Sequence, residues 1–275
     1  MLPNFIVIGA AKCGTSSICH LLGKHPDVFM STPKEIHYFG HREPHKTPSW
    51  YASFFKAASE PAIGEGSTSY THPNIIEQSA AAIAETIPDC RLIYLVRNPI
   101  KRLESDWKMR YREGWTADSI NAAVLEQQSL ISHGMYWSNI NVFRSRFPDQ
   151  QILILFLEDL CKNPQRELNK CFRHIGVDSE VKVEGLHQPR NRAGSHRDDR
   201  FLLRLARSQP FFHHAKNLVP ERAKTLLKGI FTRKHHPPSV EWDTSLRDDL
   251  TAEFRKDARQ LLQYCHKDPD YWHFE

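Results

Sequence analysis

Four short apolar runs without polar alternation constrain this chain more than any other feature of its sequence. They occupy residues 5–8, 62–63, 92–96 and 152–156, and a longer amphipathic stretch follows each run. Strands that lack polar alternation are buried on both faces, which is typical of a parallel sheet covered by helices. The pattern therefore predicts an α/β fold with a central parallel sheet flanked by helices, and we expect a single domain over residues 1–275.

Two amphipathic stretches predict helices with readable boundaries. Asn98 can cap a helix that Pro99 opens. The apolar stripe of this helix is expected to hold Ile100, Leu103, Trp107 and Tyr111, and its basic residues are expected to face elsewhere: Lys101, Arg102, Lys108 and Arg112. A second helix is predicted over residues 244–264, and residues 31–49 and 184–199 are predicted to form loops of functional importance.

The first apolar run leads directly into GAAKCGTSS at residues 9–17, and a helix-compatible segment follows. A strand, a glycine-containing turn and a helix N-terminus present backbone N–H groups to an anion, and a lysine adds a full positive charge. The residues expected to form this phosphate site are Lys12, Cys13, Gly14, Thr15, Ser16 and Ser17. Taken alone, the motif could also be an ordinary tight turn.

The loop departs from the Walker A pattern of kinases and ATPases. Lys12 precedes Gly14 by two positions, whereas the Walker A lysine directly follows the second glycine. Those enzymes also need an acid at the end of a neighbouring strand to hold magnesium, but the third apolar run ends in Arg97. Arg97 and Ser105 could instead contact a second phosphate near the start of the predicted helix. A P-loop nucleotide kinase or hydrolase stays an alternative, which magnesium-dependent ATP turnover would support.

Composition narrows the partners of the chain. A formal net charge of +5 and a pI near 8.8 suit an anionic ligand, but the basic residues are too evenly spread to predict a nucleic-acid partner. Six cysteines without C-x-x-C pairs predict reduced thiols. The apolar runs are shorter than the roughly 20 residues that cross a bilayer, and no leader pattern precedes them. We therefore expect no membrane span and a cytoplasmic location.

Two blocks carry a resemblance to a known family. KCGTSS at residues 12–17 and LIYLVRNPIKRLESDW at residues 92–107 resemble the donor-binding signatures of the PAPS-dependent sulfotransferase superfamily, where PAPS is 3'-phosphoadenosine 5'-phosphosulfate. PKEIHYFG at residues 33–40 is similar to a segment of the branch that holds heparan sulfate sulfotransferases and bacterial small-molecule enzymes. The resemblance covers nearly the whole chain. It implies a P-loop-like sulfotransferase fold, PAPS as donor, PAP as product and no metal.

The resemblance also implies roles for individual residues. Lys12 would contact the bridging and 5'-phosphate oxygens, while Arg97 and Ser105 would hold the 3'-phosphate. Glu35 would be the general base, with His37 as its rival. The segment NRAGSHR at residues 191–197 resembles a loop that folds over the nucleotide. It would contribute Arg192, Gly194, Ser195 and Arg197.

The acceptor is left open. A hydroxyl cannot be told from an amine, and we expect a small molecule or sugar-like metabolite of secondary metabolism. Trp107 is expected in the core, whereas Trp115, Tyr136 and Trp137 could line an acceptor pocket. Gly40 and Pro44 oppose a helix that would align His37, His41 and His45, so no metal site is expected. A PAP-binding module without catalysis is the alternative outside enzymology, and Glu35 disfavours it because binding alone needs no base.

Overall fold

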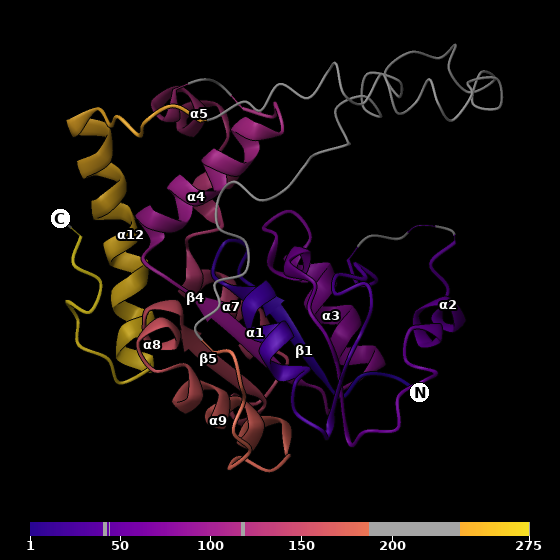
Figure 1. Cartoon of the computed structure of the whole chain (residues 1–275). Helices are drawn as coiled ribbons and strands as arrows, with labels where there is room; N and C mark the ends of the chain where they lie inside the picture. Colours follow the sequence, from indigo (N-terminus) through magenta and orange to yellow (C-terminus); the bar gives the residue numbers. More distant parts are fainter. Residues whose placement is uncertain (41–42, 44, 117–118, 187–236, 275) are drawn as a thin grey trace, which may run out of the picture.

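A computed structural model describes residues 1–40, 43, 45–116, 119–186 and 237–274. Its centre is a five-stranded parallel sheet with the strand order β2-β3-β1-β4-β5 (Figure 1). The strands are β1 (Phe5–Gly9), β2 (Val28–Met30), β3 (Ala62–Glu65), β4 (Arg91–Val96) and β5 (Ile152–Phe156). The α/β prediction is confirmed, and all four apolar runs lie in strands.

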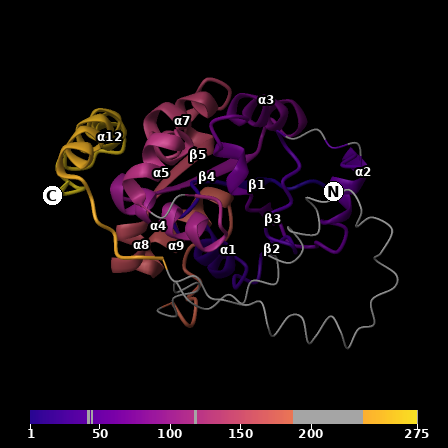
Figure 2. The ribbon, with the colours of Figure 1, turned by 90° about the horizontal axis from the view of Figure 1, so that it is seen from above.

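Helices cover both faces of the sheet, which is why its central strands contain almost no polar residues (Figure 2). The helices α1 (Thr15–Leu22) and α9 (Pro164–Ile175) pack against each other on one face. The helices α3 (Ile76–Thr86) and α7 (Tyr136–Arg144) do the same on the other. The remaining short elements are α2 (Pro48–Ser53), η1 (Thr68–Thr71), α5 (Ile120–Glu126), α6 (Ser129–Ser132), η2 (Asp149–Gln151) and α8 (Leu157–Lys162).

Two longer helices build a second hydrophobic cluster beside the sheet. In α4 (Pro99–Arg112), the Asn98 side chain accepts a hydrogen bond from the N–H of Lys101, as the capping prediction requires. The helix α12 (Thr244–Tyr264) has the predicted limits and packs on α7. The apolar sides of α4, α5, α6 and α12 meet in this cluster, in which Trp107 and Phe254 are fully buried.

The prediction that Arg102 faces away from the core is wrong. Its side chain has no solvent exposure. It pairs with Asp106 one turn later at 3.1 Å and donates to the carbonyl of Leu130 in α6. A buried charge is stable only when it is paired and hydrogen-bonded, so Arg102 links α4 to α6 instead of facing solvent.

The part of the chain that the structure describes contains no helix long and apolar enough to cross a membrane. All six cysteines are free, and four of them are buried. The strands β1, β2, β3 and β4 all end at one edge of the sheet, and the loops that leave this edge carry the residues discussed next.

Candidate functional site

The loop between β1 and α1 keeps the geometry that an anion site requires. Gly14 precedes α1 with a φ of 93°, in the left-handed region, and no side chain caps the helix there. A residue with a Cβ would be strained at this φ, and its Cβ would lie 2.8 Å from the Leu157 side chain, which would have to shift. The helix N-terminus thus keeps backbone N–H groups for a ligand.

The side chains of this loop point in different directions. Cys13, expected in the donor site, is fully buried, and its Sγ lies 3.4 Å from the Tyr136 hydroxyl. Burial raises the pKa of this thiol to about 11. Only the backbone of Cys13 can therefore meet a ligand. Ser16 and Ser17 are partly exposed at the start of α1, whereas Thr15 is buried.

Lys12 is half-buried, and its ammonium has no hydrogen-bond or ion-pair partner among the described residues. Burial lowers its pKa, and Arg112 lowers it further, while the carboxylate of Asp106 opposes both effects. A cation that has lost water without gaining a direct partner is ready to bind an anion.

Arg97 follows β4, the strand that pairs with β1, and its Nη1 donates to the backbone carbonyl of Lys12 at 3.2 Å. Its Nε is buried and has no partner among the described residues. Arg97 therefore meets the backbone of Lys12 between strands β1 and β4, where chain connections leave the sheet in opposite directions and ligands commonly bind. Ser105 is partly exposed on α4, about 9 Å along the helix axis from Pro99.

The strand β3, which pairs with the other side of β1, does end in an acidic residue, but this residue is not available to bind a metal. Glu65, the last residue of β3, is fully buried and accepts hydrogen bonds from the hydroxyls of Tyr51, Tyr70 and Ser67. Among the described residues no group of histidine, cysteine and acidic side chains is arranged to hold a metal ion.

The loop that follows β2 carries the candidate base, and we call residues 31–40 the base loop. Hydrogen bonds join it to residues 64–70 at several points. Ser31 N–H donates to the Gly64 carbonyl at 2.9 Å, and Gly66 N–H donates to the Lys34 carbonyl at 3.0 Å. The base loop is thus held against the chain that leaves the neighbouring strand β3.

Glu35 lies among hydrogen-bond donors. Its Oε1 accepts from Lys34 Nζ at 2.8 Å, and its Oε2 accepts from the Thr68 hydroxyl at 3.3 Å. His37 Nε2 lies 3.3 Å from the same Oε2, and His37 Nδ1 lies 2.7 Å from the Ser69 hydroxyl. The carboxylate is about one-third exposed, so an acceptor can reach it.

Lys34 joins the base loop to the phosphate loop, and the sequence interpretation missed it. Its Nζ donates both to Glu35 and to Thr15 Oγ1 in the first turn of α1, the latter at 3.2 Å. Gly66 makes room for this path, because a Cβ there would lie 3.1 Å from Lys34 Cε. The only signal in the sequence was the position of Lys34 beside Glu35, which suits a surface residue equally well.

The other predicted residues are only partly covered by the structure. Arg192, Gly194, Ser195, Arg197 and His41 lie outside the described residues. Tyr136 is fully buried, so it belongs to the core and not to an acceptor pocket. Trp115 is half exposed. Trp137 is partly exposed and contacts the Arg144 guanidinium.

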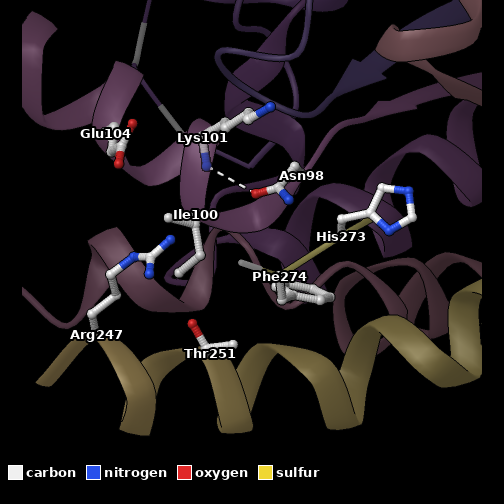
Figure 3. Close-up of a pocket in the computed structure, with 8 residues that line it drawn as sticks. All are labelled: Asn98, Ile100, Lys101, Glu104, Arg247, Thr251, His273 and Phe274. Carbon is white, nitrogen blue, oxygen red and sulfur yellow. Dashed lines mark hydrogen bonds between the residues drawn. The ribbon is translucent and has the colours of Figure 1, made fainter. Parts of the chain in front are cut away.

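A small cavity lies between α4 and α12, lined by Lys101, Glu104, Arg247 and five further residues (Figure 3). Its volume of about 110 Å³ is well below the roughly 300–1,000 Å³ of ordinary ligand pockets. The cavity is therefore too small for an adenine nucleotide, and we place the candidate site at the sheet edge instead.

Comparison with known proteins adds independent findings. A model of the sulfotransferase domain family matches residues 2–191. The chain is 25% identical over 199 residues to human bifunctional heparan sulfate N-deacetylase/N-sulfotransferase 2, which covers 64% of this chain and 22% of that protein. It is 29% identical over 186 residues to mouse heparan sulfate glucosamine 3-O-sulfotransferase 3A1, with 64% and 46% covered. The chain thus spans less than half the length of these curated relatives.

Solved structures agree on the fold. A sulfotransferase from Alicyclobacillus acidocaldarius superposes with a TM-score of 0.67 at 21% identity, over 98% of this chain and 97% of that one. The sulfotransferase domain from the curacin biosynthetic pathway superposes with a TM-score of 0.55 at 17% identity, over 95% and 98%. The predicted P-loop-like sulfotransferase fold is therefore confirmed.

Proposed function

The chain belongs to the sulfotransferase domain family, and from that premise we propose that it transfers a sulfuryl group from PAPS to a hydroxyl or amine of an acceptor. The observation that carries the proposal is the meeting of Lys12 and Arg97 at the ends of the paired strands β1 and β4. Each presents a cationic donor that lacks a partner among the described residues. A donor with a 5'-phosphosulfate and a 3'-phosphate supplies an anion for each.

The reaction is an in-line displacement at sulfur. The acceptor oxygen or nitrogen forms a bond to sulfur while the bond between sulfur and the 5'-phosphate oxygen breaks, and PAP leaves with the electron pair. Lys12 and the N-terminus of α1 stabilise the negative charge that builds on the leaving oxygen. Glu35 takes the acceptor proton.

Lys34 connects the group that takes the acceptor proton with the group that stabilises the leaving oxygen. Because its Nζ contacts both Glu35 and Thr15, the carboxylate stands next to the helix N-terminus that would hold the phosphosulfate. His37 is the competing base, and its Nε2 is close enough to Glu35 to share a proton. We assign the base to Glu35, whose accessible carboxylate is held by three neighbouring groups before any acceptor arrives.

We propose a small molecule or sugar-like metabolite as the acceptor. The curated relatives described above carry heparan sulfate in their names, so a saccharide hydroxyl or glucosamine amine belongs among the compounds to test. A partly exposed aromatic pair, Tyr38 of the base loop and Trp50 of α2, supports an acceptor with a flat or sugar-like face.

The test is a PAPS-dependent screen of candidate acceptors read by mass spectrometry, together with calorimetry of PAP binding. Glu35→Gln is expected to lower kcat by about 100- to 10,000-fold while PAP affinity stays unchanged. His37→Gln distinguishes the rival base, and Glu253→Gln on the exposed side of α12 is the matched control. If the folded protein bound neither PAP nor PAPS, the proposal would be wrong. Wild-type turnover by Glu35→Gln would remove Glu35 as the base.

A further inference from the structure

Glu65 is an acidic residue in the protein interior, where burying a charged group costs free energy. It ends β3 beside β1, and its side chain has no solvent exposure. Three hydroxyls donate to it: Tyr51 at 2.9 Å and Tyr70 at 2.6 Å to Oε1, and Ser67 at 2.5 Å to Oε2. Burial raises the pKa of Glu65, while the three hydrogen bonds act in the opposite direction by favouring the charged form. The reaction assigned above makes no use of this group.

Two of these hydroxyls also hold the backbone of the base loop. Ser67 Oγ accepts hydrogen bonds from the backbone N–H groups of residues 36 and 37, each at 3.0 Å. The Tyr70 hydroxyl accepts from Tyr38 N–H at 3.1 Å. A hydroxyl has a single proton to donate, so when that proton points at a carboxylate its lone pairs face away. Glu65 therefore sets the direction in which these two hydroxyls accept hydrogen bonds from the backbone N–H groups of three consecutive residues.

These amides surround a residue of the base loop that has an unusual backbone conformation. His37 has a φ of 53°, in the left-handed region that a residue with a Cβ rarely adopts. This conformation points the His37 ring towards both Glu35 and the Ser69 hydroxyl. The hydrogen bonds at residues 36–38 hold the backbone in this shape before any ligand binds.

We propose that Glu65 is a positioning residue for sulfuryl transfer, which acts through Ser67 and Tyr70 to hold residues 36–38 and thereby aims the side chains of Glu35 and His37. The proposal rests on the function proposed above, because it concerns the same base. Glu65 itself touches neither donor nor acceptor. An ionised carboxylate suits the task because it accepts on both oxygens, whereas a glutamine amide would donate from one side and turn a hydroxyl around.

Tyr51 provides a matched control for Tyr70. Both rings are fully buried, and both hydroxyls donate to the same Glu65 oxygen. Of these two hydroxyls, only that of Tyr70 also accepts a hydrogen bond from a backbone N–H of the base loop among the described residues. Tyr51→Phe and Tyr70→Phe therefore remove the same bond to Glu65, but only the second releases the base loop.

The experiment compares Ser67→Ala, Tyr70→Phe and Tyr51→Phe in the full chain. With the acceptor from the screen, kcat is expected to fall about 100-fold in Ser67→Ala and about 10-fold in Tyr70→Phe, and to stay within about 2-fold in Tyr51→Phe. PAP affinity by calorimetry is expected to stay unchanged in all three. Hydrogen exchange of peptides that cover residues 31–40 is expected to accelerate in Ser67→Ala and Tyr70→Phe only.

The outcomes separate this proposal from the proposed function. Equal losses of kcat in Tyr51→Phe and Tyr70→Phe, with equal falls in melting temperature, would show that Glu65 only stabilises the fold. Wild-type kcat and wild-type exchange in Ser67→Ala would also overturn the positioning role. A wild-type protein that transferred nothing from PAPS would overturn the proposed function, and the exchange comparison would still decide whether Glu65 holds the base loop.

Discussion

The base loop and the phosphate side of the site, which consists of Lys12, Arg97 and the N-terminus of α1, differ in how far their hydrogen-bonding groups are already paired. Around Glu35, hydrogen-bond donors of the chain are paired with acceptors of the chain. The pairing includes the backbone N–H groups that donate to the hydroxyls of Ser67 and Tyr70. On the phosphate side, by contrast, donors outnumber acceptors. Arg97 Nε and Lys12 Nζ lack partners among the described residues, and no side chain caps α1.

This difference separates what the fold completes alone from what a ligand must complete. A base needs a fixed direction before the acceptor arrives, and internal hydrogen bonds supply it. An anion site needs donors that are not already used, because each internal bond would have to break before the anion could bind. Substitutions on the phosphate side should therefore change interactions with the donor, and substitutions near the base loop should change the rate at constant donor affinity.

Outside the base loop, the largest effect is expected on the phosphate side, at Lys12. Lys12→Ala removes the cation that we assign to the leaving oxygen, so kcat is expected to fall about 100- to 1,000-fold, with a smaller change in PAP affinity. Steady-state kinetics and calorimetry measure the two quantities. Lys56→Ala, at an exposed position, is the control. A loss of PAP affinity with unchanged kcat would show that Lys12 only binds the nucleotide.

A smaller effect is expected at Arg97, and it should depend on the 3'-phosphate. Arg97→Ala removes charge-assisted hydrogen bonds, so PAP affinity is expected to fall about 10- to 100-fold. AMP lacks the 3'-phosphate, and its affinity should barely change. Calorimetry of both nucleotides with the variant, and with Arg173→Ala on the exposed side of α9, measures this difference. Equal losses for PAP and AMP would place Arg97 elsewhere on the nucleotide.

Lys34 is where the two regions meet, and its substitution tests whether they act together. Lys34→Met keeps the length of the side chain but removes the hydrogen bonds to Glu35 and Thr15. We expect kcat to fall about 10-fold, the loss that one charge-assisted hydrogen bond represents, with PAP affinity within about 3-fold of wild type. Unchanged kcat, measured at saturating donor, would mean that the base loop keeps its position without this link.

The sequence predicted the sheet well because its signal is local. Contiguous apolar residues mark strands buried on both faces, and 152–156 and 244–264 coincide with β5 and α12. The strand β2 was missed because it has only three residues, two of them partly exposed. The meeting of Lys12 and Arg97 could be anticipated too, because parallel strands end at one edge of a sheet.

The remaining features of the site depend on contacts between distant segments. Arg102 was misplaced because an arginine on a helix is usually solvated, and only the position of α6 reveals its buried partner carbonyl at Leu130. Lys34 and Glu65 gave no signal for a similar reason. Their roles depend on β3 lying beside β1, an arrangement that the order of strands along the chain does not specify.

The smallest effect on turnover is expected at His133, whose Nδ1 lies 4.0 Å from the carboxylate of Asp106, the buried partner of Arg102. Burial first, and the Arg102 charge second, lower the pKa of His133 to about 3, although Asp106 opposes them. The folded state thus binds fewer protons than the unfolded state between about pH 3 and the ordinary histidine pKa of about 6.5. Its contribution is complete above pH 6.5 and is lost as the pH falls below that value, by up to about 1.4 kcal/mol per pH unit.

His133→Asn keeps a donor that can reach the Ser129 carbonyl, which His133 Nδ1 contacts at 2.6 Å, and it removes the titrating ring. Urea unfolding at pH 7, 6 and 5 should therefore show a shallower loss of stability in the variant than in the wild type. Kinetics at pH 7 should show kcat within about 2-fold of wild type, because His133 is neutral there and contacts neither Lys12 nor Arg97 in the hydrogen bonds of the described residues. A parallel loss of stability in both proteins would show that His133 does not cause the loss of folding stability in acid.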